Sequence, residues 1–310
     1  MILCVTFNPV VDTALFIDNF SFVYRTDVRR VVHVAGGKGN NTARALTCLG
    51  VPARVLNPLG GNSGQHEADL LVKDGIETYV TWVSGETRVV ITLVDKNLGQ
   101  QAYFPPSVPL SLEEIGILRE RFHQALAGVE MVCLAGSSPS LEVTPLFGEF
   151  IGAAAAQGIP TLLDSYGEPL KTGLAASPTI VKANRVEVST FLGRHLESLP
   201  EQAAAVRDLL AYGSEWACLT LGADGALFAT KKGCWVSRPP VVQVVNTIGS
   251  GDSLSAGLMA GRLNGLPPEE CFRLGMAAAS ANTQTWEHGR FDPQDVQKFL
   301  KEIEIQPYTE

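Results

Sequence analysis

Short apolar segments alternate with longer amphipathic segments over most of the 310-residue chain. The short segments are rich in Val, Ile, Leu and Cys without strict alternation of polar and apolar positions, which is typical of strands buried on both faces. The longer segments repeat apolar residues at helical spacing, and several end at glycine, a common residue just after a helix. The predicted strands are residues 2–7, 53–60, 131–136, 160–165, 179–184 and 216–222, and the predicted helices are residues 41–50, 66–75, 111–126, 144–158 and 199–213.

This alternation predicts an α/β fold with a mostly parallel sheet, helices on both faces, and ligands at the carboxyl ends of the strands. Two segments interrupt it: residues 28–35, and a hairpin over residues 87–104 that turns around DKNLG. We predict that they pair as a small separate sheet over the ligand pocket, a lid; the alternative is that they extend the edge of the main sheet. The chain is then one domain over residues 1–310, with a discontinuous lid from about 13–35 and 86–106.

Composition excludes several classes of function. The chain is 45% hydrophobic and 18% charged, and its formal net charge of −8 argues against a general nucleic-acid surface. Its six cysteines form no CxxC pair, so neither a zinc module nor a disulfide framework is indicated. No apolar run has the length of a membrane span, and the amino terminus lacks the pattern of a signal peptide. We therefore expect a cytoplasmic protein without a membrane or nucleic-acid partner.

Two glycine-rich segments precede predicted helices. In AGGKGNNTARAL (residues 35–46) the glycines allow close backbone approach to a ligand, and Lys38 adds a positive charge; the alternative is a strand-to-helix turn capped by asparagine. The spacing matches neither GxxxxGK[ST] nor GxGxxG. In NTIGSGDSLSAGLMAG (residues 246–261) backbone amides crowd at a helix start, which attracts anions. Asp252 there either caps the helix or accepts the proton of an attacking hydroxyl.

Two further segments carry polar residues after predicted strands. In KANRVE, Asn184 and Glu187 could hold water around Mg²⁺ or form a capping box, and the two interpretations are compatible. In TLGADGALF, Gly222 and Gly225 flank a turn that could support a nucleotide phosphate; a plain β-turn is the alternative.

Together these segments resemble the PfkB family of carbohydrate kinases, which have the ribokinase-like fold. Residues 36–50 and 246–261 are similar to the two family signatures, NPVVD to its sugar-binding stretch, and KANRVE to its Lys-Pro-Asn-x-x-Glu element with Ala183 in the proline position. FNPVVD, TRVVITL, LLDSYGEPLKTGL and Asn246 resemble the branch of 1-phosphofructokinases and tagatose-6-phosphate kinases. Val90, Ser138, Tyr166 and residues 104–111 depart from that branch, all in sugar-side or neighbouring loops.

The resemblance implies a kinase that transfers the γ-phosphoryl group of Mg·ATP to a hydroxyl of a ketohexose phosphate: fructose 1-phosphate first, then tagatose 6-phosphate or fructose 6-phosphate. It also implies a homodimer formed through the lid. By resemblance, Asp252 is the base and the amides of Gly249, Ser250 and Gly251 stabilise the transferring group; Asp12, Gly37, Lys38, Asn41 and Arg88 bind the sugar and its phosphate; Lys182, Thr220, Gly222, Gly225 and Asn282 serve ATP, with Asn282 near the adenine; and Asn184 and Glu187 organise Mg²⁺ through water.

Other functions have specific arguments against them. A kinase for an unphosphorylated sugar or a nucleoside would leave Lys38 and Arg88 facing a neutral ligand without a partner. A non-catalytic sugar-phosphate sensor would not need Asp252. A dinucleotide-dependent dehydrogenase would carry GxGxxG after the first strand, and this chain does not. Because a helix dipole favours the charged carboxylate, Asp252 is expected to be a weakened base that takes its proton late in a loose transition state.

Overall fold

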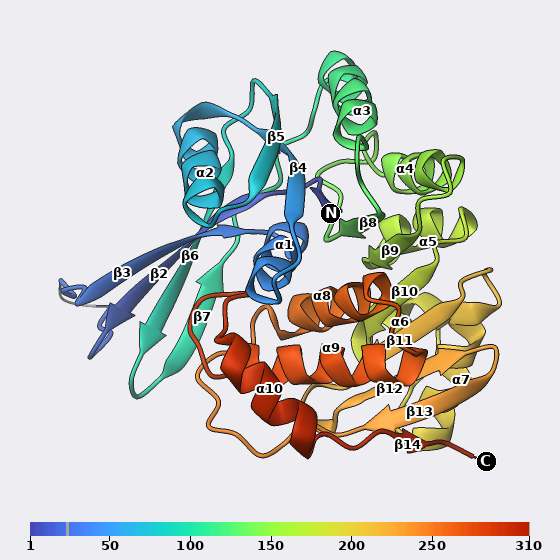
Figure 1. Cartoon of the computed structure of the whole chain (residues 1–310). Coiled ribbons are helices and arrows are strands. Elements are labelled where there is room, and N and C mark those ends of the chain that lie inside the picture. Colours follow the sequence, from blue (N-terminus) through green and yellow to red (C-terminus); the bar gives the residue numbers. More distant parts are fainter. Residues whose placement is uncertain (23–24, 310) are drawn as a thin grey trace.

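A mixed sheet runs through the middle of the molecule (Figure 1). Within residues 1–22 and 25–309, which this computed structural model describes, it has ten strands in the order β14-β13-β12-β11-β10-β9-β8-β1-β4-β5. The strands from β5 to β11 are parallel, and β12, β13 and β14 are antiparallel. The strands span Ile2–Thr6 (β1), Ala53–Leu59 (β4), Glu77–Trp82 (β5), Met131–Ala135 (β8), Thr161–Asp164 (β9), Ile180–Asn184 (β10), Trp216–Thr220 (β11), Ala226–Thr230 (β12), Gly233–Ser237 (β13) and Gln306–Pro307 (β14).

Helices cover both faces of this sheet, which explains the continuous apolar runs of its strands. In β1, Leu3 and Val5 belong to one hydrophobic cluster, and Ile2 and Cys4 to the other. The first cluster is completed by Leu112–Ala125 (α3), Leu146–Ala155 (α4), Gly167–Ala175 (α5), Arg185–Leu192 (α6) and Leu199–Leu210 (α7), and the second by Lys38–Cys48 (α1), Gly61–Lys73 (α2), Ser250–Leu263 (α8), Pro268–Asn282 (α9) and Pro293–Glu302 (α10). The predicted α/β architecture, a mostly parallel sheet with helices on both faces, is confirmed.

A second, four-stranded sheet projects from the main body (Figure 1). Its order is β3-β2-β6-β7, and β6 and β7 form the predicted hairpin around DKNLG. The prediction of a separate sheet is confirmed, although the strand between β3 and β6 was not predicted. The strands are Val10–Ile17 (β2), Arg30–Gly36 (β3), Arg88–Asp95 (β6) and Gly99–Tyr103 (β7). Residues 23 and 24, inside the predicted lid range, lie outside the described residues.

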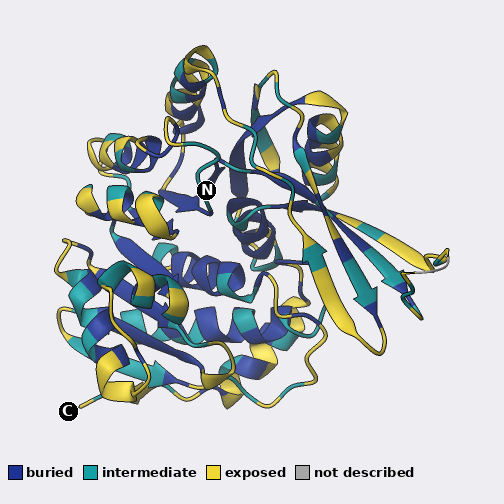
Figure 2. Ribbon diagram, turned by 180° about the vertical axis from the view of Figure 1, so that it is seen from behind, coloured by how far each residue is buried: buried dark blue, intermediate teal, exposed yellow. Residues whose placement is uncertain are grey.

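The two faces of the small sheet differ. Because partners in register share a face, Asp12, Val34 and Val90 lie on one side, and Thr13 and Ile91 on the other. The small sheet contains both buried and exposed positions (Figure 2), and its second side carries exposed apolar residues. These exposed residues are Val31, Val89, Ile91 and Tyr103.

In the main body, most residues of α8, α9 and the central strands are buried (Figure 2). The small residues of α8 serve this packing, because a Cβ at Gly257 would lie 2.5 Å from the Cα of Gly275 on α9. The six cysteines form no disulfide, and all but Cys48 are buried. None of the described helices is both long and apolar enough to cross a bilayer.

Candidate active site

The amino terminus of α8 presents backbone amides at the carboxyl edge of the sheet. Gly249 caps the helix with a φ of 85°, and a Cβ there would lie 2.8 Å from a backbone nitrogen, so glycine is required on both counts. The amide of Ser250 donates to the carbonyl of Thr247 at 3.3 Å. Among the described residues, the amides of Gly251 and Asp252 have no acceptor, as the first turn of a helix leads one to expect. The segment is therefore a ready anion site.

Asn282 holds the loop before α8 in place. Its Nδ2 donates to the carbonyl of Ile248 at 2.9 Å and to Ser250 Oγ at 3.2 Å, and its Oδ1 accepts from the amide of Gly289 at 2.7 Å. The side chain is 1% exposed. Its amide is thus occupied by the protein itself, so Asn282 acts on the anion site by fixing the backbone rather than by offering a free hydrogen-bonding group.

Asp252 is buried beside that anion site. Its Oδ2 accepts a hydrogen bond from Asn41 Nδ2 at 2.8 Å, which joins α8 to the first turns of α1. Burial raises the pKa of Asp252, and the negative charge of Asp164 adds to this, against the opposing effects of Lys182 and Lys38. The net direction of the pKa is upward, against the expectation of a weakened base, because desolvation and the charge of Asp164 outweigh the two lysines and the hydrogen bond from Asn41.

Asp164, for which the sequence indicated no role, lies at the centre of the site. It ends β9 and is fully buried, with Lys182 Nζ at 2.7 Å, Lys38 Nζ at 2.9 Å and Ser255 Oγ at 3.2 Å. Although burial raises it, the pKa of Asp164 is brought down to about 2 by the two lysines. A Cβ at Gly251 would lie 2.7 Å from Lys182 Nζ, so this ammonium lies directly against the start of α8. A polar residue ending an apolar strand was the available signal.

Lys38 points toward the acidic cluster. Its Nζ also contacts Glu187 Oε1 at 3.1 Å and lies 5.8 Å from the ring centre of Tyr166. Burial opposes its charge, but Asp164 and Glu187 together raise the pKa of Lys38. The argument that Lys38 would lack a partner beside a neutral sugar is therefore wrong, because two carboxylates already pair with it.

The capping box predicted for KANRVE is present. Asn184 Oδ1 accepts from the amide of Glu187 at 2.9 Å, and Glu187 Oε2 accepts from the amide of Asn184 at 2.7 Å. No group of three or more His, Cys, Asp or Glu side chains among the described residues could hold a metal ion directly. Glu187 Oε1 and Asp164 are also engaged by Lys38. If magnesium binds here, Asn184 and Glu187 are the residues that would hold it through water, and it would neutralise phosphate charge.

Arg88, at the start of β6, is a cation without an acidic partner among the described residues. Its Nη2 donates to the carbonyl of Asn8 at 3.2 Å and its Nη1 to that of Pro105 at 3.4 Å, while its buried Nε has no acceptor. Burial lowers the pKa of Arg88. Asn8 Nδ2 in turn contacts Ser107 Oγ and Ser137 Oγ, both at 2.9 Å, so two of the unusual loops meet at this point. An anion would complete the environment of the guanidinium.

Asp12 lies on the inner face of the small sheet, next to the glycine-rich turn. A Cβ at Gly36 would lie 2.1 Å from Asp12 Oδ2, so the backbone of the turn passes directly over the carboxylate. Gly37 follows as the residue that precedes α1. In register with Asp12 stands the apolar Val90. The imidazole of His288 reaches the same carboxylate, with Nδ1 at 3.4 Å from Oδ2.

Gly222 and Gly225 flank a single 3₁₀ turn that follows Thr220, the last residue of β11. Both glycines have positive φ, and a Cβ at Gly225 would lie 2.0 Å from the carbonyl oxygen of Ser237. The turn and its tight packing against β13 are consistent with the simpler β-turn interpretation. A role of these glycines in binding a nucleotide phosphate stays a prediction.

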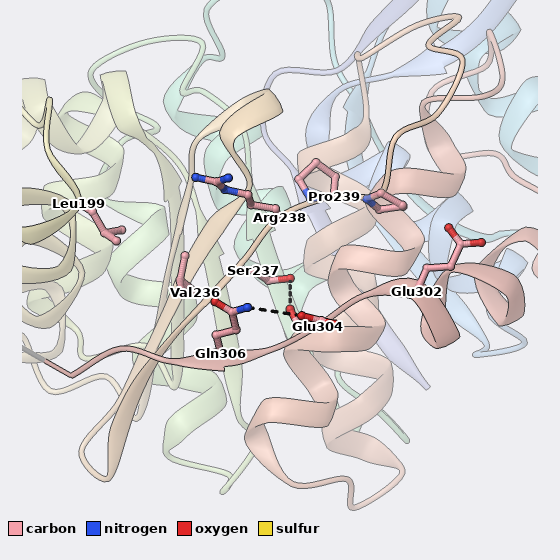
Figure 3. A pocket seen from close by; sticks show the side chains of 9 residues that line it. Leu199, Val236, Ser237, Arg238, Pro239, Glu302, Glu304 and Gln306 are labelled. Atoms are coloured by element: carbon pink, nitrogen blue, oxygen red, sulfur yellow. Dashed lines mark hydrogen bonds between the residues drawn. The ribbon is translucent and has the colours of Figure 1, made fainter.

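A pocket of about 490 Å³ opens beyond this turn, at the β13 and β14 edge of the sheet (Figure 3). In Figure 3, Ser237 and Gln306 converge on Glu304. The predicted site residues do not line it, so we place the candidate active site at the buried charged cluster instead. The lining residues are Leu199, Val236, Ser237, Arg238, Pro239, Pro240, Glu302, Glu304 and Gln306.

Comparison with known proteins identifies the class. Residues 5–292 match the pfkB family of carbohydrate kinases, so the chain belongs to that family and is a sugar phosphotransferase. It is 30% identical over 306 residues to the 1-phosphofructokinase of Bacillus subtilis, covering 98% of this chain and 99% of that protein. It is 29% identical to the tagatose-6-phosphate kinase of Staphylococcus epidermidis, with 98% and 99% covered.

The fold agrees with these sequence relatives. Phosphofructokinase-2 from Escherichia coli superposes with a TM-score of 0.90 at 28% identity, over 97% of this chain and 98% of that one. The match extends over the main sheet and the small sheet, since nearly the whole of each chain is covered.

Proposed function

We propose that this protein transfers the γ-phosphoryl group of Mg·ATP to a hydroxyl of a ketohexose phosphate, with Asp252 as the base. The observation that carries the proposal is the buried Asp252 carboxylate at the start of α8, between free backbone amides and Asn41. Fructose 1-phosphate is the favoured acceptor, followed by tagatose 6-phosphate and fructose 6-phosphate. A cytoplasmic location is part of the proposal.

Each charged group of the site has a separate proposed role. Asp252 orients the acceptor hydroxyl and takes its proton, which its raised pKa favours. The amides of Gly251 and Asp252, with the ammonium of Lys182 beside them, stabilise the negative charge of the phosphoryl group in transfer. Asp164 keeps both lysines charged and in position.

Substrate and cofactor are proposed to occupy opposite sides of Asp252. Asp12, Gly37 and Asn41 border the sugar, and Arg88 holds its phosphate because it has no carboxylate partner among the described residues. Lys38 is also proposed to bind the sugar and its phosphate, and its pairing with Asp164 and Glu187 holds its ammonium at the charged cluster.

The nucleotide is proposed to rest on the turn of Gly222 and Gly225 after Thr220. Magnesium would supply charge neutralisation at the phosphates, with Asn184 and Glu187 holding its water.

The small sheet is proposed to act as the lid and as a dimer interface. It leaves unpaired edges at β3 and β7, which invite strand pairing. Its outer face also exposes Val31, Val89 and Ile91, which water does not favour.

The test is an ADP-release assay with Mg·ATP and a panel of fructose 1-phosphate, tagatose 6-phosphate, fructose 6-phosphate, fructose, ribose and adenosine. We expect turnover on one phosphorylated ketose. Asp252→Asn should lower kcat by roughly 10²–10⁴-fold with little change in KM, the usual contribution of a general base. Turnover confined to neutral acceptors would contradict the role of Arg88, and an unchanged kcat in Asp252→Asn would remove Asp252 from the reaction.

A further inference from the structure

His288 lies where the acceptor side and the transfer side of the site meet. It belongs to the segment between α9 and α10, far in sequence from the glycine-rich turn. Its Nδ1 lies 3.4 Å from Asp12 Oδ2, and the side chains of His288 and Asp12 are only 10% and 18% exposed. A Cβ at Gly249 would lie 3.0–3.1 Å from the Cα and Cβ of His288, so the residue also packs against the start of α8.

The imidazole has an unused polar atom. Nδ1 is buried and has no hydrogen-bond partner among the described residues. Burying a polar atom without a partner is unfavourable, because the atom loses its hydrogen bonds to water, so a native structure that retains one calls for an explanation. On the small sheet, the residue in register with Asp12 is the apolar Val90, which offers no polar contact.

The backbone of His288 is held independently of its ring. Its carbonyl accepts from Arg44 Nη1 at 2.7 Å, and the following amide, of Gly289, donates to Asn282 Oδ1 at 2.7 Å. Arg44 is 2% exposed and is itself paired with Asp74 at 2.6 Å. The main chain is therefore fixed from both sides, and the ring is presented beside Asp12 in a preorganised position.

We propose that His288 is a substrate-contacting residue that sets specificity for the acceptor: its Nδ1 hydrogen-bonds a hydroxyl of the ketose phosphate that also binds Asp12. One hydroxyl can donate to the carboxylate and accept from the imidazole, so it satisfies both groups. The bulk of the ring closes the acceptor site toward the start of α8. This inference rests on the proposed function and names a residue that the sequence motifs did not indicate.

The experiment compares wild type, His288→Ala, His288→Asn and the exposed control His123→Ala, using the ketose phosphate that the wild type phosphorylates. Kinetics give KM for the sugar, KM for ATP and kcat, and calorimetry without ATP measures sugar binding directly. Loss of one such hydrogen bond should raise sugar KM and Kd about tenfold in His288→Ala, with KM for ATP within about twofold. His288→Asn, which restores a polar atom near Nδ1, should recover most of the loss.

Three results would overturn the inference while leaving the proposed function standing. Sugar KM and Kd in His288→Ala could stay within about twofold of wild type; KM for ATP could rise as much as KM for the sugar; or His288→Asn could behave like His288→Ala, which would make the ring a packing element. A wild type that neither phosphorylates nor binds any ketose phosphate would instead overturn both proposals. Thermal unfolding of each variant establishes that it is folded.

Discussion

Replacing Asp164 by asparagine tests the energetics of the charged cluster. The change keeps the shape of the side chain but removes the counterion of Lys182, a residue that is 3% exposed and whose Nζ is 2.7 Å away. Breaking a buried ion pair from one side typically costs about 3–5 kcal/mol, because the remaining charge stays desolvated. Since an amide oxygen still accepts one hydrogen bond and Ser255 remains nearby, we expect a loss of about 3 kcal/mol.

The pKa of Asp164 gives a second estimate of how much its charge contributes to the free energy of unfolding. The pKa of Asp164 falls from an ordinary 3.8 to about 2 in the folded protein, which corresponds to about 2 kcal/mol of stability. Because the folded pKa is depressed, this contribution is fully present above about pH 4 and is lost as the pH falls through about 2. The asparagine variant lacks this contribution. The difference in free energy of unfolding between wild type and variant should therefore become smaller as the pH falls from about 4 to about 2.

Urea denaturation followed by circular dichroism at pH 7 and pH 3 measures both effects. The control is Glu149→Gln, which breaks the exposed pair with Arg119 at 2.7 Å and should cost under about 1 kcal/mol. A loss for Asp164→Asn no larger than this control would refute the reasoning. In the double variant Asp164→Asn/Lys182→Met, part of the stability should return, because no buried charge is left unpaired.

Three further outcomes are expected. Gly249→Ala should lower the thermal midpoint markedly and abolish turnover, because alanine tolerates neither the φ of 85° nor the 2.8 Å approach to a backbone nitrogen; a fully active variant would contradict this. Arg88→Gln should raise KM for the ketose phosphate about 10–100-fold but not KM for ATP, since a charge-assisted contact to the phosphate is lost; equal changes in both constants would argue against that role. The pH profile of kcat should decline toward acid, beginning above the ordinary pKa of an aspartate, because Asp252 acts as a base with a raised pKa; a flat acid limb would contradict it.

Much of the fold could be predicted because buried strands and amphipathic helices leave local signals. Residues 53–60 and 111–126, for example, correspond to β4 and α3 with shifts of one residue at their ends. The strand Val10–Ile17 was missed, since its first three residues lie in NPVVD, which was interpreted as a sugar-binding stretch. The short strands β12, β13 and β14 were also missed: β12 and β13 form a hairpin of two brief apolar runs, and β14 is two residues long with a partner that is distant in sequence.

The site also contains residues that the sequence indicates and residues that only the structure reveals. Asp252, Asn184 and Glu187 could be identified because capping and anion binding at a helix start depend on neighbours within a few residues. The role of Asp164 could not, because it depends on lysines from α1 and β10 that only the sheet order brings together. The same holds for His288, because it contacts Asp12, a residue near the other end of the sequence.

The sequence alone determined the class of fold, the separate hairpin sheet and the family, because hydrophobic periodicity and short motifs are local properties of a chain. Only the tertiary structure determined which charged groups of the site pair with one another and how their pKa values shift. It paired Lys38 with Asp164 and Glu187, left Arg88 without an acidic partner among the described residues, and raised the pKa of Asp252. The physical reason is that burial and Coulomb interactions depend on distances in space, and these are set by which strands lie side by side.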